Sequence, residues 1–71
     1  VKPVVTVSGS TIQVLTNGAV VDDVMVFDLL GNCVASTVAD SDCSFDMPHG
    51  GVYVVRINCG NAVYSNKVIV K

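Results

Sequence analysis

The sequence predicts an all-β fold, a seven-stranded immunoglobulin-like β-sandwich made of two small antiparallel or mixed sheets. Of its 71 residues 51% are apolar, valine is the commonest of them, and neither glutamate nor tryptophan occurs. β-Branched side chains lose freedom in a helix but pack well on a pleated sheet, so this composition favours strands. Short alternating segments separated by turn residues are typical of a sandwich, and no stretch shows ten residues of capped helical periodicity.

The predicted strands are Val4 to Val7, Thr11 to Thr16, Asp23 to Leu29, Cys33 to Val38, Cys43 to Met47, Val52 to Cys59 and Ala62 to Val70.

Turn residues separate these segments in order. Pro3 precedes the first segment, where its missing N–H does little harm, and Ser8-Gly9-Ser10 joins the first to the second. Asn17-Gly18 ends the second segment, Gly31-Asn32 ends the third, and Gly60-Asn61 joins the sixth to the seventh. Glycine and asparagine tolerate positive φ, so we expect hairpins or tight loops at these points.

The sixth segment alternates most clearly. Its two faces are Tyr53, Val55, Ile57 and Cys59 on one side and Val54, Arg56 and Asn58 on the other. Arg56 decides which face is buried, because an unpaired guanidinium would cost several kcal/mol in an apolar interior. We therefore expect Arg56 to face water and Tyr53 to face the core.

Three cysteines occur, Cys33, Cys43 and Cys59, an odd number without a short CxxC spacing. If Val34 faces inward on its strand, Cys33 faces outward, whereas Cys43 and Cys59 face the core. Buried free thiols are favoured, and a bridge between Cys43 and Cys59 remains the alternative.

Charge and length limit the classes of function. Charged residues make up 14% of the chain and the net charge is −2, so we expect no binding of nucleic acid. All six aspartates lie between residues 22 and 46, whereas Arg56, Lys67 and Lys71 lie near the carboxyl end. The uncharged run from Pro3 to Val21 is too polar for a spanning helix, so we expect no membrane insertion. We expect one domain, residues 1–71, excised from a larger secreted protein because the chain begins at Val1.

The residues of catalysis are missing, and we predict that the protein is not an enzyme. His49 is the single histidine, and nothing in the sequence supplies a third group to orient it beside Cys43 or a serine. We expect no cofactor, because the chain has no glycine-rich phosphate loop.

We also expect no metal site. Aligning Asp40 with the first position of an EF-hand loop puts Phe45 at the glycine position and Gly51 at the bidentate glutamate position, so that interpretation fails. A looser calcium site in the Asp40-Ser41-Asp42 segment is a minor alternative. A zinc site from Cys33, Cys43, His49 and Cys59 would need thiols that the predicted parity places on opposite faces.

Three segments, in this order, carry a resemblance to a known family. The first is a strand that runs into an aspartate and glycine turn, Val24 to Asn32, followed by Val34, with Asp28 and Gly31 in the turn. The second is a short strand and loop, Phe45 to Met47, followed by Gly51-Val52-Tyr53-Val54-Val55-Arg56-Ile57, and the third is the terminal strand Lys67-Val68-Ile69-Val70-Lys71. The chain resembles, over nearly its whole length, the carboxyl-terminal sorting domain (type A, Por secretion family) of cargo proteins exported by the bacterial type IX secretion system. Asn32 stands where that family usually carries a lysine.

The resemblance implies a non-enzymatic secretion signal. Such domains follow an N-terminal passenger, are recognised by the outer-membrane type IX translocon, and are then removed by a sortase-like peptidase during surface attachment. It implies a passage through the periplasm and a final location at the cell surface or outside the cell. By position, the signal would lie in Asp28, Gly31, Gly51, Tyr53, Lys67, Val68, Ile69, Val70 and Lys71.

The physical roles of these residues differ. Gly31 and Gly51 allow turns, while Tyr53 and the Val and Ile residues supply the core, so their loss would act through unfolding. Lys67 and Lys71 are predicted to be exposed, and their replacement would test direct recognition.

Two other functions stay open. The chain could be a structural accessory module of a secreted or cell-surface enzyme or adhesin. It could also be a small carbohydrate-binding module, which would need Tyr64 and Phe27 to face outward together, although packing roles are favoured for both. Exposed edge strands in a Val-rich sheet also predict homodimers that depend on concentration.

Overall fold

The computed structural model describes residues 2–38, 41–60 and 62–71, which form seven strands. The strands are β1 (Val4–Ser8), β2 (Thr11–Leu15), β3 (Asp23–Phe27), β4 (Cys33–Thr37), β5 (Cys43–Asp46), β6 (Gly51–Cys59) and β7 (Ala62–Val70). Over these ranges there is no helix, and hence none that could cross a membrane. The predicted all-β class and all seven strands are confirmed, with ends within two residues of those expected.

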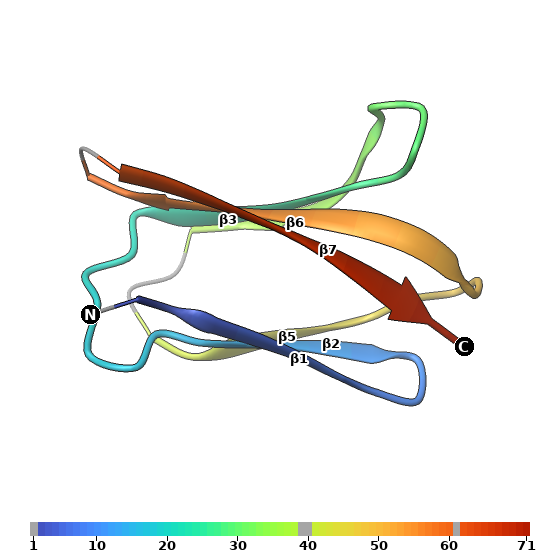
Figure 1. The fold of residues 1–71 in the computed structure, drawn as a ribbon, viewed down its shortest axis with the longest axis horizontal. Helices are drawn as coiled ribbons and strands as arrows, with labels where there is room; N and C mark the ends of the chain where they lie inside the picture. Colours follow the sequence, from blue (N-terminus) through green and yellow to red (C-terminus); the bar gives the residue numbers. More distant parts are fainter. Residues whose placement is uncertain (1, 39–40, 61) are drawn as a thin grey trace.

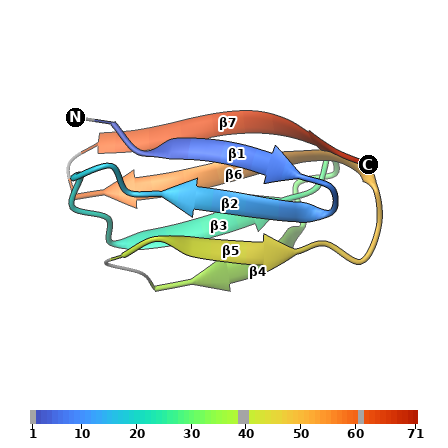
Figure 2. The same ribbon diagram turned by 90° about the horizontal axis from the view of Figure 1, so that it is seen from below.

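The strands form two facing layers (Figure 1). One sheet has the order β1-β2-β5 and the other the order β4-β3-β6-β7, and every pair is antiparallel. In a constant-type immunoglobulin domain the fourth strand joins the sheet of the first, second and fifth strands, whereas here β4 pairs with β3. Figure 2 shows β7 alongside β1, and this contact closes one side of the sandwich.

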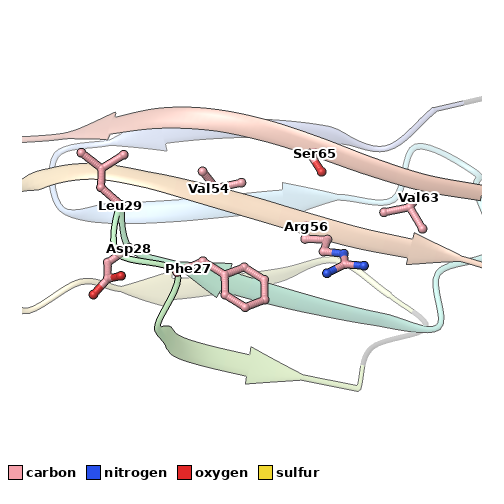
Figure 3. Close-up of a pocket in the computed structure, with 8 residues that line it drawn as sticks. Phe27, Asp28, Leu29, Val54, Arg56, Val63 and Ser65 are labelled. Carbon is pink, nitrogen blue, oxygen red and sulfur yellow. The ribbon is translucent and has the colours of Figure 1, made fainter.

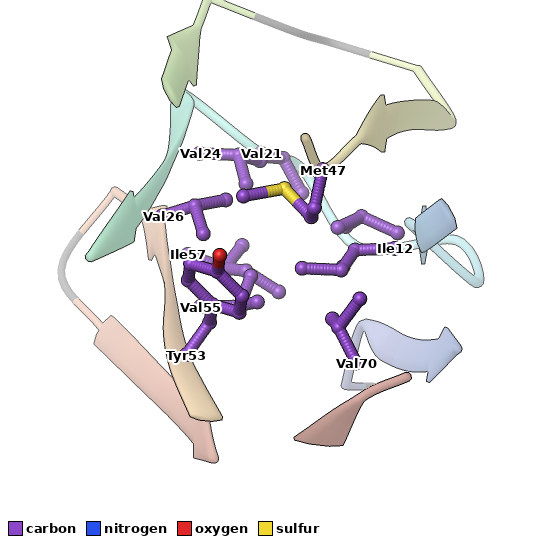
Figure 4. Close-up of a cluster of buried hydrophobic side chains, with 10 residues drawn as sticks. Ile12, Val21, Val24, Val26, Met47, Tyr53, Val55, Ile57 and Val70 are labelled. Atoms are coloured by element: carbon purple, nitrogen blue, oxygen red, sulfur yellow. The ribbon is translucent and has the colours of Figure 1, made fainter. Parts of the chain in front are cut away.

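The core lies between the sheets and consists of alternate strand residues together with Val21, which precedes β3, and Met47, which follows β5 (Figure 4). Its buried members are Ile12, Val14, Val21, Val24, Val26, Met47, Tyr53, Val55, Ile57 and Val70. On β6 the predicted parity is confirmed, because Tyr53 is 8% exposed, Val55 and Ile57 are fully buried, and Arg56 is exposed. One inward face on each strand is the pattern that a period of two demands.

The parity predicted for β4 is wrong. Val34 was expected to face the core, but its side chain is 45% exposed and Ala35 packs against the core instead. The register shifts here, since Val26 pairs with Ala35 while Phe27 pairs with Cys33. A β-bulge adds one unpaired residue and reverses the alternation beyond it. Cys33 is exposed as expected, although for this different reason.

All three cysteines are free thiols, as the favoured interpretation predicts. Cys43 and Cys59 are partly buried and pack against the core. Burial, assisted by the neighbouring Asp42 carboxylate, raises the pKa of the Cys43 thiol. This thiol is consequently held in its neutral, weakly nucleophilic form.

Candidate functional site

Parts of all three segments of the predicted signal meet at one end of the four-stranded sheet, whereas Phe45 to Met47 of the second segment lies at β5 and its end, in the other sheet. The register places Phe27 of β3 opposite Val54 of β6, and Val54 opposite Lys67 of β7. At the same end, Gly51 begins β6 opposite Val70, which ends β7. The aspartate turn follows β3 directly. Segments that are far apart in the sequence therefore form one contiguous region, which we call the junction end of the sheet.

The turn after β3 is organised by the carboxylate of Asp28. The backbone N–H groups of Leu30 and Asn32 donate to its Oδ1, each at 2.9 Å, and the Asn32 side-chain amide donates to its Oδ2 at 3.3 Å. Gly31 completes the turn with φ 87°, a left-handed conformation that favours glycine. The backbone N–H of Asn32 has the largest effect and lowers the pKa of Asp28. Desolvation opposes it, and hydrogen bonds from the Asn32 side chain and from the backbone of Leu30 and Gly31 lower the pKa further.

This turn holds two apolar side chains in solvent, Leu29 at 66% and Leu30 at 87% exposure. Asn32, which replaces the lysine usual in the resembled family, contributes to the turn through its hydrogen bond to Asp28.

The second segment fixes the loop that precedes β6. Gly51 has φ 146° and no atom within 4 Å of an added Cβ, so backbone conformation alone explains the glycine. Tyr53 packs in the core, and its hydroxyl donates a 2.8 Å hydrogen bond to the backbone carbonyl of His49. The tyrosine thus ties the strand to its own loop, consistent with the expected structural roles of Gly51 and Tyr53.

Gly50 has a structural role that was not predicted from the sequence. A Cβ at Gly50 would lie 3.0 Å from the carbonyl carbon of Lys71 and 3.1 Å from the carbonyl oxygen of Val70. The loop before β6 therefore packs directly on the backbone at the end of β7, and a Cβ at Gly50 would fit only if that backbone moved by a few tenths of an ångström. The Gly50-Gly51 doublet was the available signal, because one turn glycine does not explain two.

The last strand presents two different faces. Val68 packs against the core and Val70 is 2% exposed, whereas Lys67 and Lys71 are exposed, as predicted. The core role predicted for Ile69 is wrong, because its side chain lies on the outward face with the lysines, one position out of phase with Val68 and Val70, and is 69% exposed. The outward face of β7 is therefore basic and apolar, while the inward face holds the strand in place.

A shallow depression of about 480 Å³ lies on the outside of the same sheet (Figure 3). Phe27, Val54 and Val63 contribute apolar surface to it, and Asp28, Arg56 and Ser65 contribute polar groups. Leu29 extends to its rim from the turn. The alternation of β6 predicts Arg56 on this outward face, but the alternation of one strand does not predict the depression.

Comparison with known protein families assigns the domain to one family. The model of a family described as a domain of unknown function, DUF6383, matches residues 2–70. The chain belongs to this family. No curated protein matches the DUF6383 chain significantly.

The described part of the DUF6383 domain contains no cluster of three or more His, Cys, Asp or Glu side chains that could hold a metal ion. The calcium alternative includes Asp40, which lies outside the described residues. Asp42, its described carboxylate, accepts hydrogen bonds from the backbone N–H and hydroxyl of Thr16 at 2.8 and 3.1 Å. His49 is exposed in its loop.

The aromatic pair needed for a carbohydrate platform is divided between two faces. Tyr64 packs against the core, as a packing role requires, whereas Phe27 is half-buried on the outer face of the sheet. Since sugar platforms need coplanar exposed rings, these two side chains do not form one in the DUF6383 domain.

Proposed function

We propose that this domain is a secretion signal of the type IX system, which directs an N-terminal passenger across the outer membrane and is then removed by a sortase-like peptidase. The proposal rests on the resemblance of three ordered segments and on the meeting of parts of all three at the junction end of the sheet. It implies transit through the periplasm and delivery to the cell surface or beyond. In this proposal the domain acts by being recognised and carries out no chemistry.

One observation supports the proposal most strongly, the division of the signal residues by burial. Gly51, Tyr53 and Val70 have clear structural reasons for their identity, from backbone conformation, hydrogen bonding and burial. Lys67 and Lys71 are exposed on the final strand, so packing gives no reason for their identity. Exposed residues without a packing role are the ones available to an exporter.

The direct test is a fusion of residues 1–71 to the carboxyl end of a periplasm-directed reporter, expressed in a host with a type IX system and in its exporter-deficient strain. We expect reporter at the surface only when the exporter is present. A Lys67→Ala/Lys71→Ala variant should remain folded, because exposed substitutions usually change stability by less than about 0.5 kcal/mol, and should lose export. Lys2→Ala, which changes an exposed lysine before β1, is the matched control and should be exported normally.

Retention of the wild-type reporter in the periplasm, with the domain shown to be folded, would contradict the proposal and support the structural accessory module instead. Normal export of the double lysine variant would keep the sorting function but remove the lysines from the signal.

A further inference from the structure

The outer faces of the two sheets differ in polarity. On the three-stranded sheet the central outward row is polar, formed by Thr6, Gln13 and Ser44. The four-stranded sheet presents half-buried or exposed apolar side chains, namely Met25, Phe27, Val52, Val54, Val63 and Ile69. Of these, Val63 is 54% and Ile69 is 69% exposed. We call this second surface the apolar face.

Two positively charged side chains lie on the apolar face. Arg56 lines the depression, and Lys67 lies opposite Val54 on the neighbouring strand. Ser65 lies opposite Arg56, two positions before Lys67 on β7. The two positive groups therefore stand on adjacent strands within one patch (Figure 3 shows Arg56).

Two carboxylates lie near these cations, Asp28 in the lining of the depression and Asp23 on the outward face of β3, and both are held by uncharged donors. Each of the five described aspartates accepts a hydrogen bond from an uncharged donor: Asp22 from Gly60, Asp23 from Asn58, Asp28 from Leu30 and Asn32, Asp42 from Thr16, and Asp46 from Thr11. The lowered pKa of Asp28, the acid nearest the depression, is caused by its turn and not by Arg56. The positive charge of the apolar face is thus available to an external group.

We propose that the apolar face is a docking surface for a partner protein segment that combines apolar side chains with carboxylates placed opposite Arg56 and Lys67. The two cations favour an acidic occupant over a second copy of the chain, because the matching face of a second copy would carry the same two cations. A short segment that lies on one face of a molecule measuring 30 × 22 × 17 Å covers less than the roughly 800 Å² per partner of a standard interface. The complex is accordingly weak and reversible. This inference goes beyond the proposed sorting function, because it does not depend on an exporter.

The test uses two acetylated hexapeptides, one of alternating glutamate and valine and one of alternating lysine and valine, added to the 71-residue chain labelled with ¹⁵N. The acidic peptide should shift the amide resonances of β3, β6 and β7 around the depression, and the basic peptide should not. Arg56→Gln and Lys67→Gln should each weaken the acidic peptide about two- to fivefold, the size expected of one exposed ion pair. Lys2→Gln, which removes an equal charge away from the face, should leave its affinity unchanged.

The apolar contribution is tested by a second matched pair. Val63→Thr replaces an exposed apolar group beside the depression with an isosteric hydroxyl and should weaken the acidic peptide, while Val4→Thr on the other sheet should not. Unchanged amide dispersion in each variant shows that the fold is intact, so loss of binding is not loss of structure.

Three results would overturn the proposal. The first is equal shifts with both peptides, and the second is shifts that map to the three-stranded sheet or to an edge strand. The third is a change in the same resonances with protein concentration alone, which would make a second copy the occupant. Because no exporter is present, none of these results bears on the sorting function, and failure of the reporter fusion would not affect the peptide result.

Discussion

Substitution of Gly50 by alanine tests the contact between the loop before β6 and the end of β7. Gly50 is not among the glycines with positive φ, so its backbone conformation suits alanine. The added Cβ would nevertheless meet the Lys71 carbonyl carbon at 3.0 Å and the Val70 carbonyl oxygen at 3.1 Å. Both neighbours are backbone atoms, and Val70 is held in the core at 2% exposure.

Two opposing effects determine how much Gly50→Ala changes the free energy of unfolding. Alanine in place of glycine reduces the entropy of the unfolded chain and stabilises the fold by about 0.4 to 1 kcal/mol. Overpacking costs about 1 to 3 kcal/mol, and the lower half of that range applies because Lys71 lies beyond the last strand and can shift. We expect Gly50→Ala to lower the free energy of unfolding by about 1 kcal/mol, which for a chain of this size lowers Tm by about 4 to 8 °C.

Thermal unfolding followed by calorimetry measures this difference, and a double-mutant cycle with a chain ending at Val70 assigns its cause. A chain without Lys71 lacks the contact with the Lys71 carbonyl carbon, and the Val70 carbonyl oxygen then belongs to a free carboxyl terminus, which can move. In that shortened chain Gly50→Ala should therefore be neutral within about 0.5 kcal/mol or stabilising. An equal loss with and without Lys71, or no loss in the full chain, would refute the reasoning.

Three further predictions concern single groups. Tyr53→Phe removes the 2.8 Å hydrogen bond to the His49 carbonyl and should cost about 1 kcal/mol in chemical unfolding, whereas no change would mean that water replaces the bond. The pKa of Asp28 is lowered from 3.8, so the ionised carboxylate should stabilise the fold above that pH, and this contribution should be lost as the pH falls through the folded pKa. Asp28→Asn should therefore make the free energy of unfolding less dependent on pH in the acid range. An unchanged midpoint of acid unfolding would show that the Asp28 carboxylate does not contribute. Exposed Cys33 should react with iodoacetamide at pH 8 well before Cys43, whose pKa is raised; equal rates, measured by mass spectrometry, would contradict the burial of Cys43.

Period-two alternation made most of the fold predictable from the sequence. On β6 a single charged residue, Arg56, was enough to orient nine residues, because a register slip would have buried a guanidinium. The turns were equally clear, since Gly9, Gly31 and Gly60 all adopt positive φ. Such features depend on residues that are close together in the sequence, so they can be predicted from the sequence alone.

The features that were missed depend on contacts between distant segments. The bulge at Val34 arises from how β4 meets β3, so the alternation of β4 alone gave the wrong inward residue. The requirement for Gly50 arises from the approach of residues about 20 positions later in the chain. The depression around Arg56 needs three strands in one register. Each of these features depends on pairing, which the sequence of one strand does not specify.

The separation of acids from bases along the chain has a physical counterpart in the fold. The described aspartates accept hydrogen bonds from turn amides, threonine hydroxyls and asparagine, so they stabilise structure over short distances. Arg56 and Lys67 instead stand exposed on one outer face, where any interaction with a partner is screened by salt. Raising the ionic strength should therefore weaken recognition of the acidic peptide while leaving Tm nearly unchanged. A parallel loss of stability would mean that the bases hold the fold together, and that the apolar face is not a separate recognition surface.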